Sequence, residues 1–92
     1  MNKKDDMSII SLLARSEKRI KVLKSLERED KIPSRISKDI DDNSNHVSKY
    51  LKTLKDVELV ECLNEEDKRY RFYSITEKGK YYLDKVEKDY KY

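Results

Sequence analysis

Residues 33–76 read PSRISKDIDDNSNHVSKYLKTLKDVELVECLNEEDKRYRFYSIT, and this stretch is the most informative part of the chain. It holds two short helical patterns on either side of a polar turn, followed by two strand-like runs. Apolar side chains at positions 47, 50, 51 and 54 have the spacing of one buried helical stripe, which predicts a helix from Ser44 to Asp56. The opposite face of this helix carries short polar side chains near its start and lysines further along.

A shorter helical pattern precedes this one. Pro33 suits the first turn of a helix, and Ile36 and Ile40 lie four residues apart on a segment of about two turns. Because so short a helix is unstable alone, it must pack against another element. The polar residues 41–43 break the pattern, and either Asn43 or Ser44 can cap the next helix through its side-chain oxygen. Two helices around such a turn form a helix-turn-helix motif.

Two strand candidates follow, at residues 59–63 and 70–75. The first is mostly aliphatic, and the second is rich in aromatic and other β-favouring residues. The wholly polar residues 64–69 between them predict the loop of a hairpin. Carboxylates precede the cations in this loop, so only its returning side is basic. Ile32, directly before Pro33, is expected to form a short first strand that pairs with the hairpin.

The apolar pattern predicts one small core. Ser16 followed by Glu17 indicates the start of an earlier helix, whose apolar stripe meets the stripes of the two later helices. Tyr50 has the same phase as its apolar neighbours and is expected in the core. The other predicted core residues are Ile20, Val22, Leu23, Leu26, Ile36, Ile40, Val47, Leu51, Leu54 and Val60.

From about Leu13 to Leu83 the chain resembles the small archaeal winged helix-turn-helix transcription regulators related to the ArsR and MarR families. The resemblance rests on LARSEKRIKVLKSLE at 13–27, PSRISKDI at 33–40, SNHVSKYLKTLKD at 44–56, LVECL at 59–63 and RYRFYSITEKGK at 69–80. It implies an α+β, mainly α fold with a two- to three-stranded antiparallel wing sheet and flanking N- and C-terminal helices. Members usually carry a glycine after the recognition helix, whereas this chain has Asp56, Val57 and Glu58, so we expect a differently built exit turn.

The resemblance implies a sequence-specific, double-stranded DNA-binding transcription regulator with helix 44–56 in the major groove. Short hydrogen-bonding side chains followed by cations suit base edges and then phosphates, although such a face can also be ordinary solvated surface. The residues expected to read bases are Asn45, His46, Ser48 and Lys49. The residues expected to contact phosphates are Ser34, Arg35, Ser44, Lys52, Lys68, Arg69 and Arg71. The alternative is a winged-helix protein–protein interaction module without sequence-specific DNA binding, which the acidic hairpin tip and the net charge of only +3 favour.

The two ends of the chain carry further apolar patterns. An apolar run at residues 7–13 precedes the first helix, and Thr76 and Glu77 start a last helix. Because a 92-residue chain with 45% charged residues has a thin core, these stripes are expected to form a homodimer surface. The expected interface residues are Ile9, Ile10, Leu13, Tyr82, Leu83, Val86 and Tyr90. The same stripes could instead fold back onto their own subunit. The MarR resemblance also allows the tyrosines to line a pocket for a small-molecule effector.

Composition limits the remaining possibilities. We expect a disordered N-terminus at residues 1–6 and a single domain at residues 7–92. Gly79 is the only glycine and no cysteine lies close to a histidine in sequence, so we do not expect an enzyme. With one cysteine, Cys62, and one histidine, His46, one subunit cannot build a thiolate-rich metal site, and we expect neither metal nor cofactor. The lone cysteine and the lack of a signal peptide or membrane-spanning run predict a cytoplasmic protein.

Overall fold

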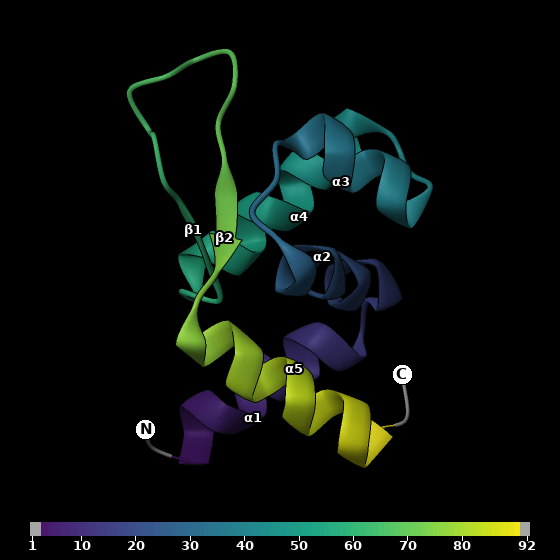
Figure 1. Cartoon of the computed structure of the whole chain (residues 1–92). Helices are drawn as coiled ribbons and strands as arrows, with labels where there is room; N and C mark the ends of the chain where they lie inside the picture. The colour runs from purple at the N-terminus through teal and green to yellow at the C-terminus, as the bar shows by residue number, and fades with distance from the viewer. Residues whose placement is uncertain (1–2, 91–92) are drawn as a thin grey trace.

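The computed structural model describes residues 3–90, and this part of the chain forms five helices and a small antiparallel sheet (Figure 1). The elements are α1 (Lys3–Ala14), α2 (Glu17–Arg28), α3 (Pro33–Ile40), α4 (Ser44–Asp56), β1 (Val60–Cys62), β2 (Tyr73–Ile75) and α5 (Glu77–Tyr90). The mainly helical winged-helix fold is therefore confirmed, and α3 and α4 have the bounds that the sequence predicted. No helix in the described range is long and apolar enough to cross a membrane.

The N-terminal segment differs from the prediction. Helix α1 begins at Lys3, whereas residues 1–6 were expected to be disordered. Its polar first turn has a partner, because Asp6 accepts a hydrogen bond from the hydroxyl of Tyr82 on α5 and another from the ammonium of Lys85 at 3.1 Å. Residues 1 and 2 lie outside the described residues, so the prediction is not tested for them.

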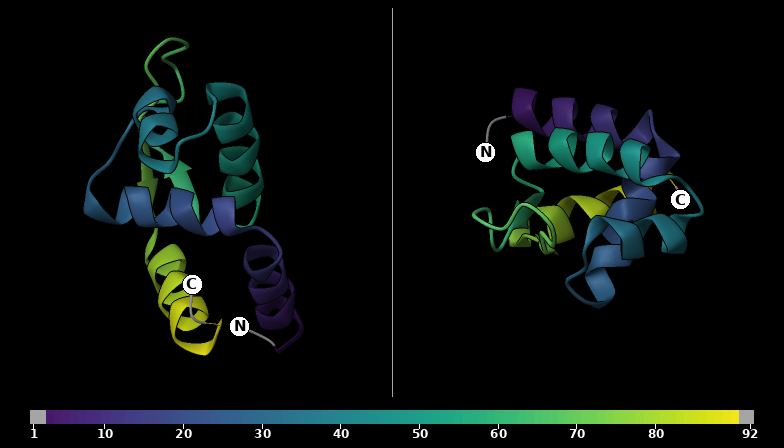
Figure 2. Two further views of the ribbon diagram at one scale, coloured as in Figure 1. Left: turned by 90° about the vertical axis from the view of Figure 1, so that its right-hand side faces the viewer. Right: turned by 90° about the horizontal axis from the view of Figure 1, so that it is seen from above.

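Helix α2 is the central element of the fold. It contacts every other helix and strand β2. Helices α3 and α4 and the hairpin lie on one side of α2, and α1 and α5 lie on the other side (Figures 1 and 2). The predicted core residues Ile20, Val22, Leu23, Leu26, Ile36, Ile40, Val47, Leu51, Leu54 and Val60 are all buried. Tyr50 is half-buried and packs against the edge of this core.

The ends of the helices follow local side-chain chemistry. Ser16 caps α2 by accepting a hydrogen bond from the Arg19 amide, and Asn43 caps α4 by accepting one from the His46 amide. The exit from α4 is built without glycine. Glu58 takes the left-handed conformation at φ 63°, its amide donates to the Lys55 carbonyl, and the amide of residue 59 donates to the carbonyl of residue 54. These two bonds form a Schellman motif with glutamate at the usual glycine position.

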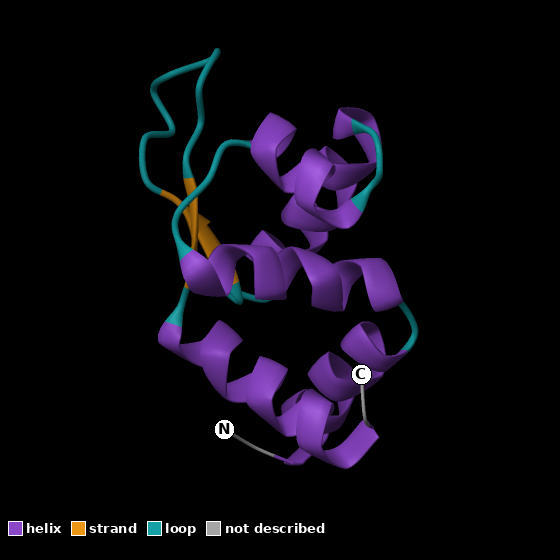
Figure 3. Cartoon of the chain, turned by 45° about the vertical axis from the view of Figure 1, so that its right-hand side comes forward, coloured by secondary structure: helices purple, strands orange, loops and turns teal. Residues whose placement is uncertain are grey.

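The sheet is shorter than the sequence suggested. Strands β1 and β2 pair antiparallel with Val60 opposite Ile75, and the connection between them spans residues 63–72 rather than 64–69 (Figure 3). The prediction of Ile32 as the first strand was wrong by one residue, because Lys31 exchanges both backbone hydrogen bonds with Tyr73. The Ile32 carbonyl instead accepts hydrogen bonds from the amides of residues 35 and 36, in the first turn of α3.

Lys31 also ties α2 to α3 through its side chain. Its buried ammonium donates to the Ser25 carbonyl at 2.7 Å and to the Ser25 hydroxyl, and it forms an ion pair with Asp39. The hydrogen bonds from Lys31 and then Ser25 lower the pKa of Asp39. A buried lysine is stable only when it is paired in this way. Nothing in the sequence pattern indicated this network.

The predicted dimer surface is mostly core. Ile9, Leu13, Tyr82, Leu83 and Val86 are buried within their own subunit, where α1 and α5 pack against each other and against α2. These side chains cannot also cover a partner, so the structure follows the alternative in which the stripes fold back. The Tyr82 ring fills the core and therefore does not line an effector pocket. Ile10 is half-buried, and the side chain of Tyr90 lies outside the described residues.

Gly79 lies where α5 packs directly against the backbone of residue 59. It lies in the first turn of α5, where a Cβ atom would stand 2.1 Å from the Leu59 carbonyl oxygen and 2.7 Å from the Ile75 side chain. Thr76 supports this junction, because its amide donates to the Leu59 carbonyl and its hydroxyl donates to the Glu58 carbonyl at 2.7 Å. The start of α5 is thus joined directly to the exit turn of α4.

Replacing Gly79 with alanine should therefore destabilise the protein. The added methyl group would push the first turn of α5 away from the Leu59 carbonyl. We expect a loss of about 2 to 3 kcal/mol in the free energy of unfolding. Urea titration followed by circular dichroism would measure it. Lys80→Ala, on the exposed side of the same turn, is the matched control. Equal stability of the two variants would contradict the close packing at Gly79.

Candidate nucleic-acid interface

A basic groove runs between α4 and the wing, which we define as residues 60–75. The groove has a volume of about 400 Å³, and α4 forms one of its walls. Its lining residues are Pro33, Ser48, Lys52, Lys55, Lys68, Arg69, Arg71 and Tyr73. None of these lining residues is acidic. Cations from two separate elements therefore converge on one hollow, as a polyanionic ligand requires.

Helix α4 presents two faces to its surroundings. Val47, Leu51 and Leu54 are buried against the core, which leaves the polar face outside. Ser48 and Lys52 lie one turn apart and point toward the wing, in the groove lining. Asn45 and Lys49 are exposed on α4 but do not line the groove. The residues predicted to read bases thus share an accessible helix, and their DNA contacts stay a prediction.

Beyond the backbone hydrogen bond from the Leu63 amide to the Phe72 carbonyl, side chains hold much of the wing loop. The Asn64 side chain donates to the Tyr70 carbonyl at 2.8 Å and accepts from the Phe72 amide at 2.8 Å, so it bridges the two sides of the hairpin. Asp67 accepts the amides of Arg69 and Tyr70, and these backbone hydrogen bonds lower the pKa of its carboxyl. One acidic side chain of the tip is therefore occupied by the turn itself.

A second carboxylate of the tip is paired with a lysine of α4. Glu65 forms an ion pair with Lys55 of α4, and this contact lowers the pKa of Glu65 and raises the pKa of Lys55. Arg71 is fixed on the same loop by donating to the backbone carbonyls of Glu65 and Asp67, at 3.2 and 3.0 Å. The ion pair between Lys55 and Glu65 joins the wing tip to α4, and it neutralises a carboxylate that would repel phosphates.

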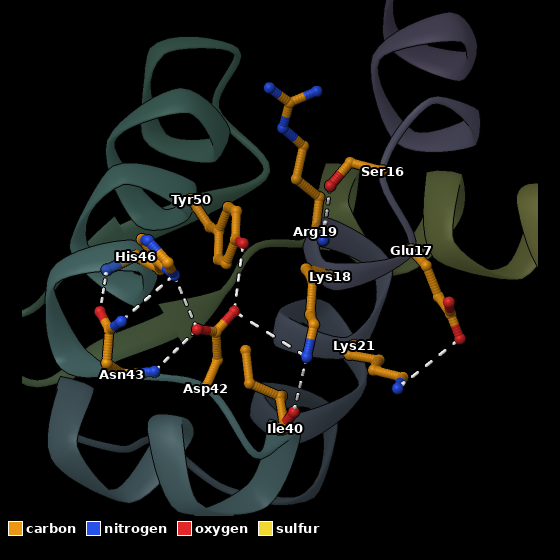
Figure 4. Close-up of polar contacts among 10 residues, drawn as sticks. All are labelled: Ser16, Glu17, Lys18, Arg19, Lys21, Ile40, Asp42, Asn43, His46 and Tyr50. Atoms are coloured by element: carbon orange, nitrogen blue, oxygen red, sulfur yellow. Dashed lines mark hydrogen bonds and ion pairs between the residues drawn. The ribbon is translucent and has the colours of Figure 1, made fainter.

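A polar cluster stands at the start of α4 (Figure 4). The Asp42 carboxylate lies 2.8 Å from Nδ1 of His46, and it accepts a hydrogen bond from the Tyr50 hydroxyl at 3.2 Å. Lys18 of α2 approaches the same carboxylate at 3.9 Å and donates to the Ile40 carbonyl. The hydrogen bond from His46 is the main reason that the pKa of Asp42 is lowered. His46 is thus held in place while half of its side chain stays exposed.

The remaining predicted phosphate contacts are dispersed. Ser34 and Arg35 are exposed in the first turn of α3, and Arg35 lines hollows beside Phe72 and beside Asp39 rather than the basic groove. Ser44 is exposed as the first residue of α4, and Asn43 provides the cap. Sequence reasoning missed Lys55, although its spacing of three residues from Lys52 and seven from Ser48 places it on the same helix face.

Asn64→Ala should loosen the wing and leave the rest of the fold intact. Both bridging hydrogen bonds are lost, but the side chain is remote from the core, so we expect the amide of Phe72 to exchange much faster with solvent. Hydrogen exchange followed by NMR would measure this, with the amides of α2 as the internal reference. Unchanged protection of the Phe72 amide would show that the wing does not depend on this bridge.

Comparison with known proteins agrees with this geometry. The family described as winged helix-turn-helix matches residues 14–91, most of the chain. Among curated proteins, none matches this chain. Among solved structures, ZitR of Lactococcus lactis in complex with DNA is similar at 21% identity with a TM-score of 0.70, over 83% of this chain and 53% of that chain. The chain thus spans about half the length of ZitR.

Two further structures cover more of both proteins. The transcriptional regulator BldR from Sulfolobus solfataricus is 16% identical with a TM-score of 0.74, over 99% of this chain and 81% of that chain. The homodimeric winged helix-turn-helix DNA-binding domain Mb0332 from Mycobacterium bovis, a possible ArsR-family regulator, is 20% identical with a TM-score of 0.72, over 92% and 80%. These likenesses show the fold, and the match over residues 14–91 shows that the chain belongs to the winged helix-turn-helix family.

Proposed function

We propose that this protein is a cytoplasmic, non-enzymatic transcription regulator, related to the archaeal ArsR- and MarR-like proteins, that binds specific double-stranded DNA. The observation that carries the proposal is the groove in which cations from α4 and the wing converge without an acidic lining residue. Such cations neutralise phosphates and release counterions, which supplies most of the affinity of a protein for DNA. ZitR, a protein with this fold, was solved in complex with DNA, which supports DNA binding by this chain.

In the proposed complex α4 enters the major groove, whose width admits a helix. Asn45, Ser48 and Lys49 on its exposed face read base edges. Lys52 lies further along the same helix and meets phosphates together with Lys68, Arg69 and Arg71 of the wing, while Lys55 is paired with Glu65. Because the whole-chain charge is only +3, it is the distribution of charge and not its sum that supports binding.

We also propose that the protein binds its operator as a homodimer. Two α4 helices related by a twofold axis would meet half-sites about 34 Å apart on nearly palindromic DNA. The homodimeric description of Mb0332 supports this proposal. Among the side chains that the structure describes on α1 and α5, Met7 and Tyr81 are exposed and Ile10 and Leu12 are half-buried. We assign the interface to these two helices.

A protein-interaction module is the second candidate, and one observation favours it. Leu63, Tyr70 and Phe72 are exposed on the wing, at 52%, 59% and 43% of their surface. Exposed apolar groups gathered on one element suit a protein partner. Selection of bound sequences from a random duplex pool at about 0.15 M salt would separate the candidates. Enrichment of a near-palindrome supports the DNA regulator, and no enrichment supports the interaction module.

Lys52→Ala should weaken binding to all duplexes to a similar extent. Removal of one phosphate contact should reduce the slope of log affinity against log salt by about one unit. Fluorescence anisotropy over a salt series would measure the slope. Lys88→Ala is the matched control and should keep the original slope, because this exposed lysine belongs to α5, on the other side of α2 from α4 (Figure 1). A Lys52→Ala slope equal to the control removes this residue from the phosphate contacts.

Asn45→Ala should instead change sequence preference. We expect a loss of about 1 to 3 kcal/mol on the selected operator and a relaxed requirement at one base pair of each half-site. Affinity for random duplex DNA should change little. Competition binding with operators mutated one base pair at a time would reveal the relaxed position. Equal losses on operator and random DNA would rule out a base-reading role for Asn45.

A further inference from the structure

The cluster at the start of α4 fixes one proton of His46. Nδ1 of the ring lies 2.8 Å from the Asp42 carboxylate, a group that only accepts hydrogen bonds when ionised. Asp42 is kept ionised because it also accepts the Tyr50 hydroxyl and the Asn43 amide and lies 3.9 Å from the Lys18 ammonium. The proton between the two groups must therefore sit on Nδ1.

The second ring nitrogen is available to a ligand. Within the described part of the chain Nε2 of His46 has no hydrogen-bond partner, whereas Nδ1 has the close contact to Asp42 and a longer one of 3.3 Å to the Asn43 side-chain nitrogen. The side chain is 52% exposed and belongs to the first turn of α4, next to Asn45. In the proposed complex this turn enters the major groove first.

We propose that Asp42 is a positioning residue that holds His46 with its proton on Nδ1, so that Nε2 makes a DNA contact whose polarity depends on a second proton. The inference rests on the proposed function. With one proton on the ring, Nε2 only accepts hydrogen bonds, as from an amino group of adenine or cytosine. With two, it donates to a phosphate oxygen or to guanine.

The charges around the ring decide whether the DNA complex holds His46 with one proton or with two. The charged groups near the ring are the Asp42 carboxylate, the Lys18 ammonium behind it and the positive end of the α4 dipole. Asn43 and the Tyr50 hydroxyl are uncharged. Phosphates add negative charge on the open side of the ring, so the bound state takes the second proton. Because the complex holds more protons than the free partners, affinity should fall as the pH rises.

His46 is the only histidine in the sequence, so NMR signals of imidazole nitrogens can be assigned to it directly. NMR of the ring nitrogens in the free protein, at a pH where the imidazole is neutral, reports its tautomer without any DNA. We expect the proton on Nδ1 in the wild type. Asp42→Asn keeps the shape but can turn its amide nitrogen toward the ring, and should move the proton to Nε2. A wild-type ring protonated on Nε2 would overturn the positioning role.

Affinity for the selected operator, measured from about pH 5 to 8 at constant ionic strength, tests the DNA contact. Wild type should lose up to about tenfold per pH unit, the limit for one linked proton. His46→Gln should remove this dependence, and Asp42→Asn should shift it to lower pH. Asn45→Ala is the matched control, because it weakens binding but should keep the wild-type dependence.

The outcomes separate the two proposals. The same pH dependence in wild type and His46→Gln overturns the proton-linked contact and leaves the DNA regulator standing. Absence of salt-dependent DNA binding in every variant overturns the proposed function, and the tautomer measured in the free protein then still decides the role of Asp42.

Discussion

The fold depends on the contact between the backbones of Leu59 and Gly79. At this point the exit turn of α4, the base of the wing and the first turn of α5 meet. Thr76 donates hydrogen bonds to two carbonyls of the exit turn, those of Glu58 and Leu59. The contact leaves no room for a side chain. Since β1 begins directly after this turn, the contact joins α4, the base of the wing and the start of α5 at one place.

The electrostatics of the interface result from pairing rather than from an excess of cations. The carboxylates of Glu65 and Asp67 belong to the wing that should face phosphates, yet Lys55 binds the first and the backbone of the turn occupies the second. Arg71 is held by backbone carbonyls, so its charge is not neutralised by an acidic side chain among these contacts. A chain with nearly balanced charge can in this way present a cationic surface locally.

Much of the fold could be predicted from the sequence because its periodic patterns are sharp. Pro33 and the cap at Asn43 mark α3 and α4, and the buried stripe of α4 fixes which face is left for a ligand. Most residues of the predicted dimer surface lie in the core for a physical reason: an amphipathic stripe predicts that a helix face is covered, but not whether its own subunit or a partner covers it. The side chains of Leu13 and Tyr82 are covered by their own subunit.

The site was predictable in part. Residues on α4 were found because helical spacing places them together, whereas the Lys55–Glu65 pair depends on how the wing folds over the helix, which no local pattern encodes. No local pattern predicts that Lys31 pairs with Tyr73 of β2. Nor does one predict the environment of Asp42, whose partners come from α2 and α4. Contacts between distant segments require the tertiary structure.

The side-chain bridges of the wing also bear on how such a protein changes over time. Asn64 closes the hairpin where the strands have ended, and Asp67 completes the turn beyond it, so the tip satisfies its own backbone without using the core. Apart from the pair between Glu65 and Lys55, the segment beyond Asn64 is held by its own contacts. A change in its sequence would therefore alter the side chains beside the basic groove while the register of β1 and β2 is kept.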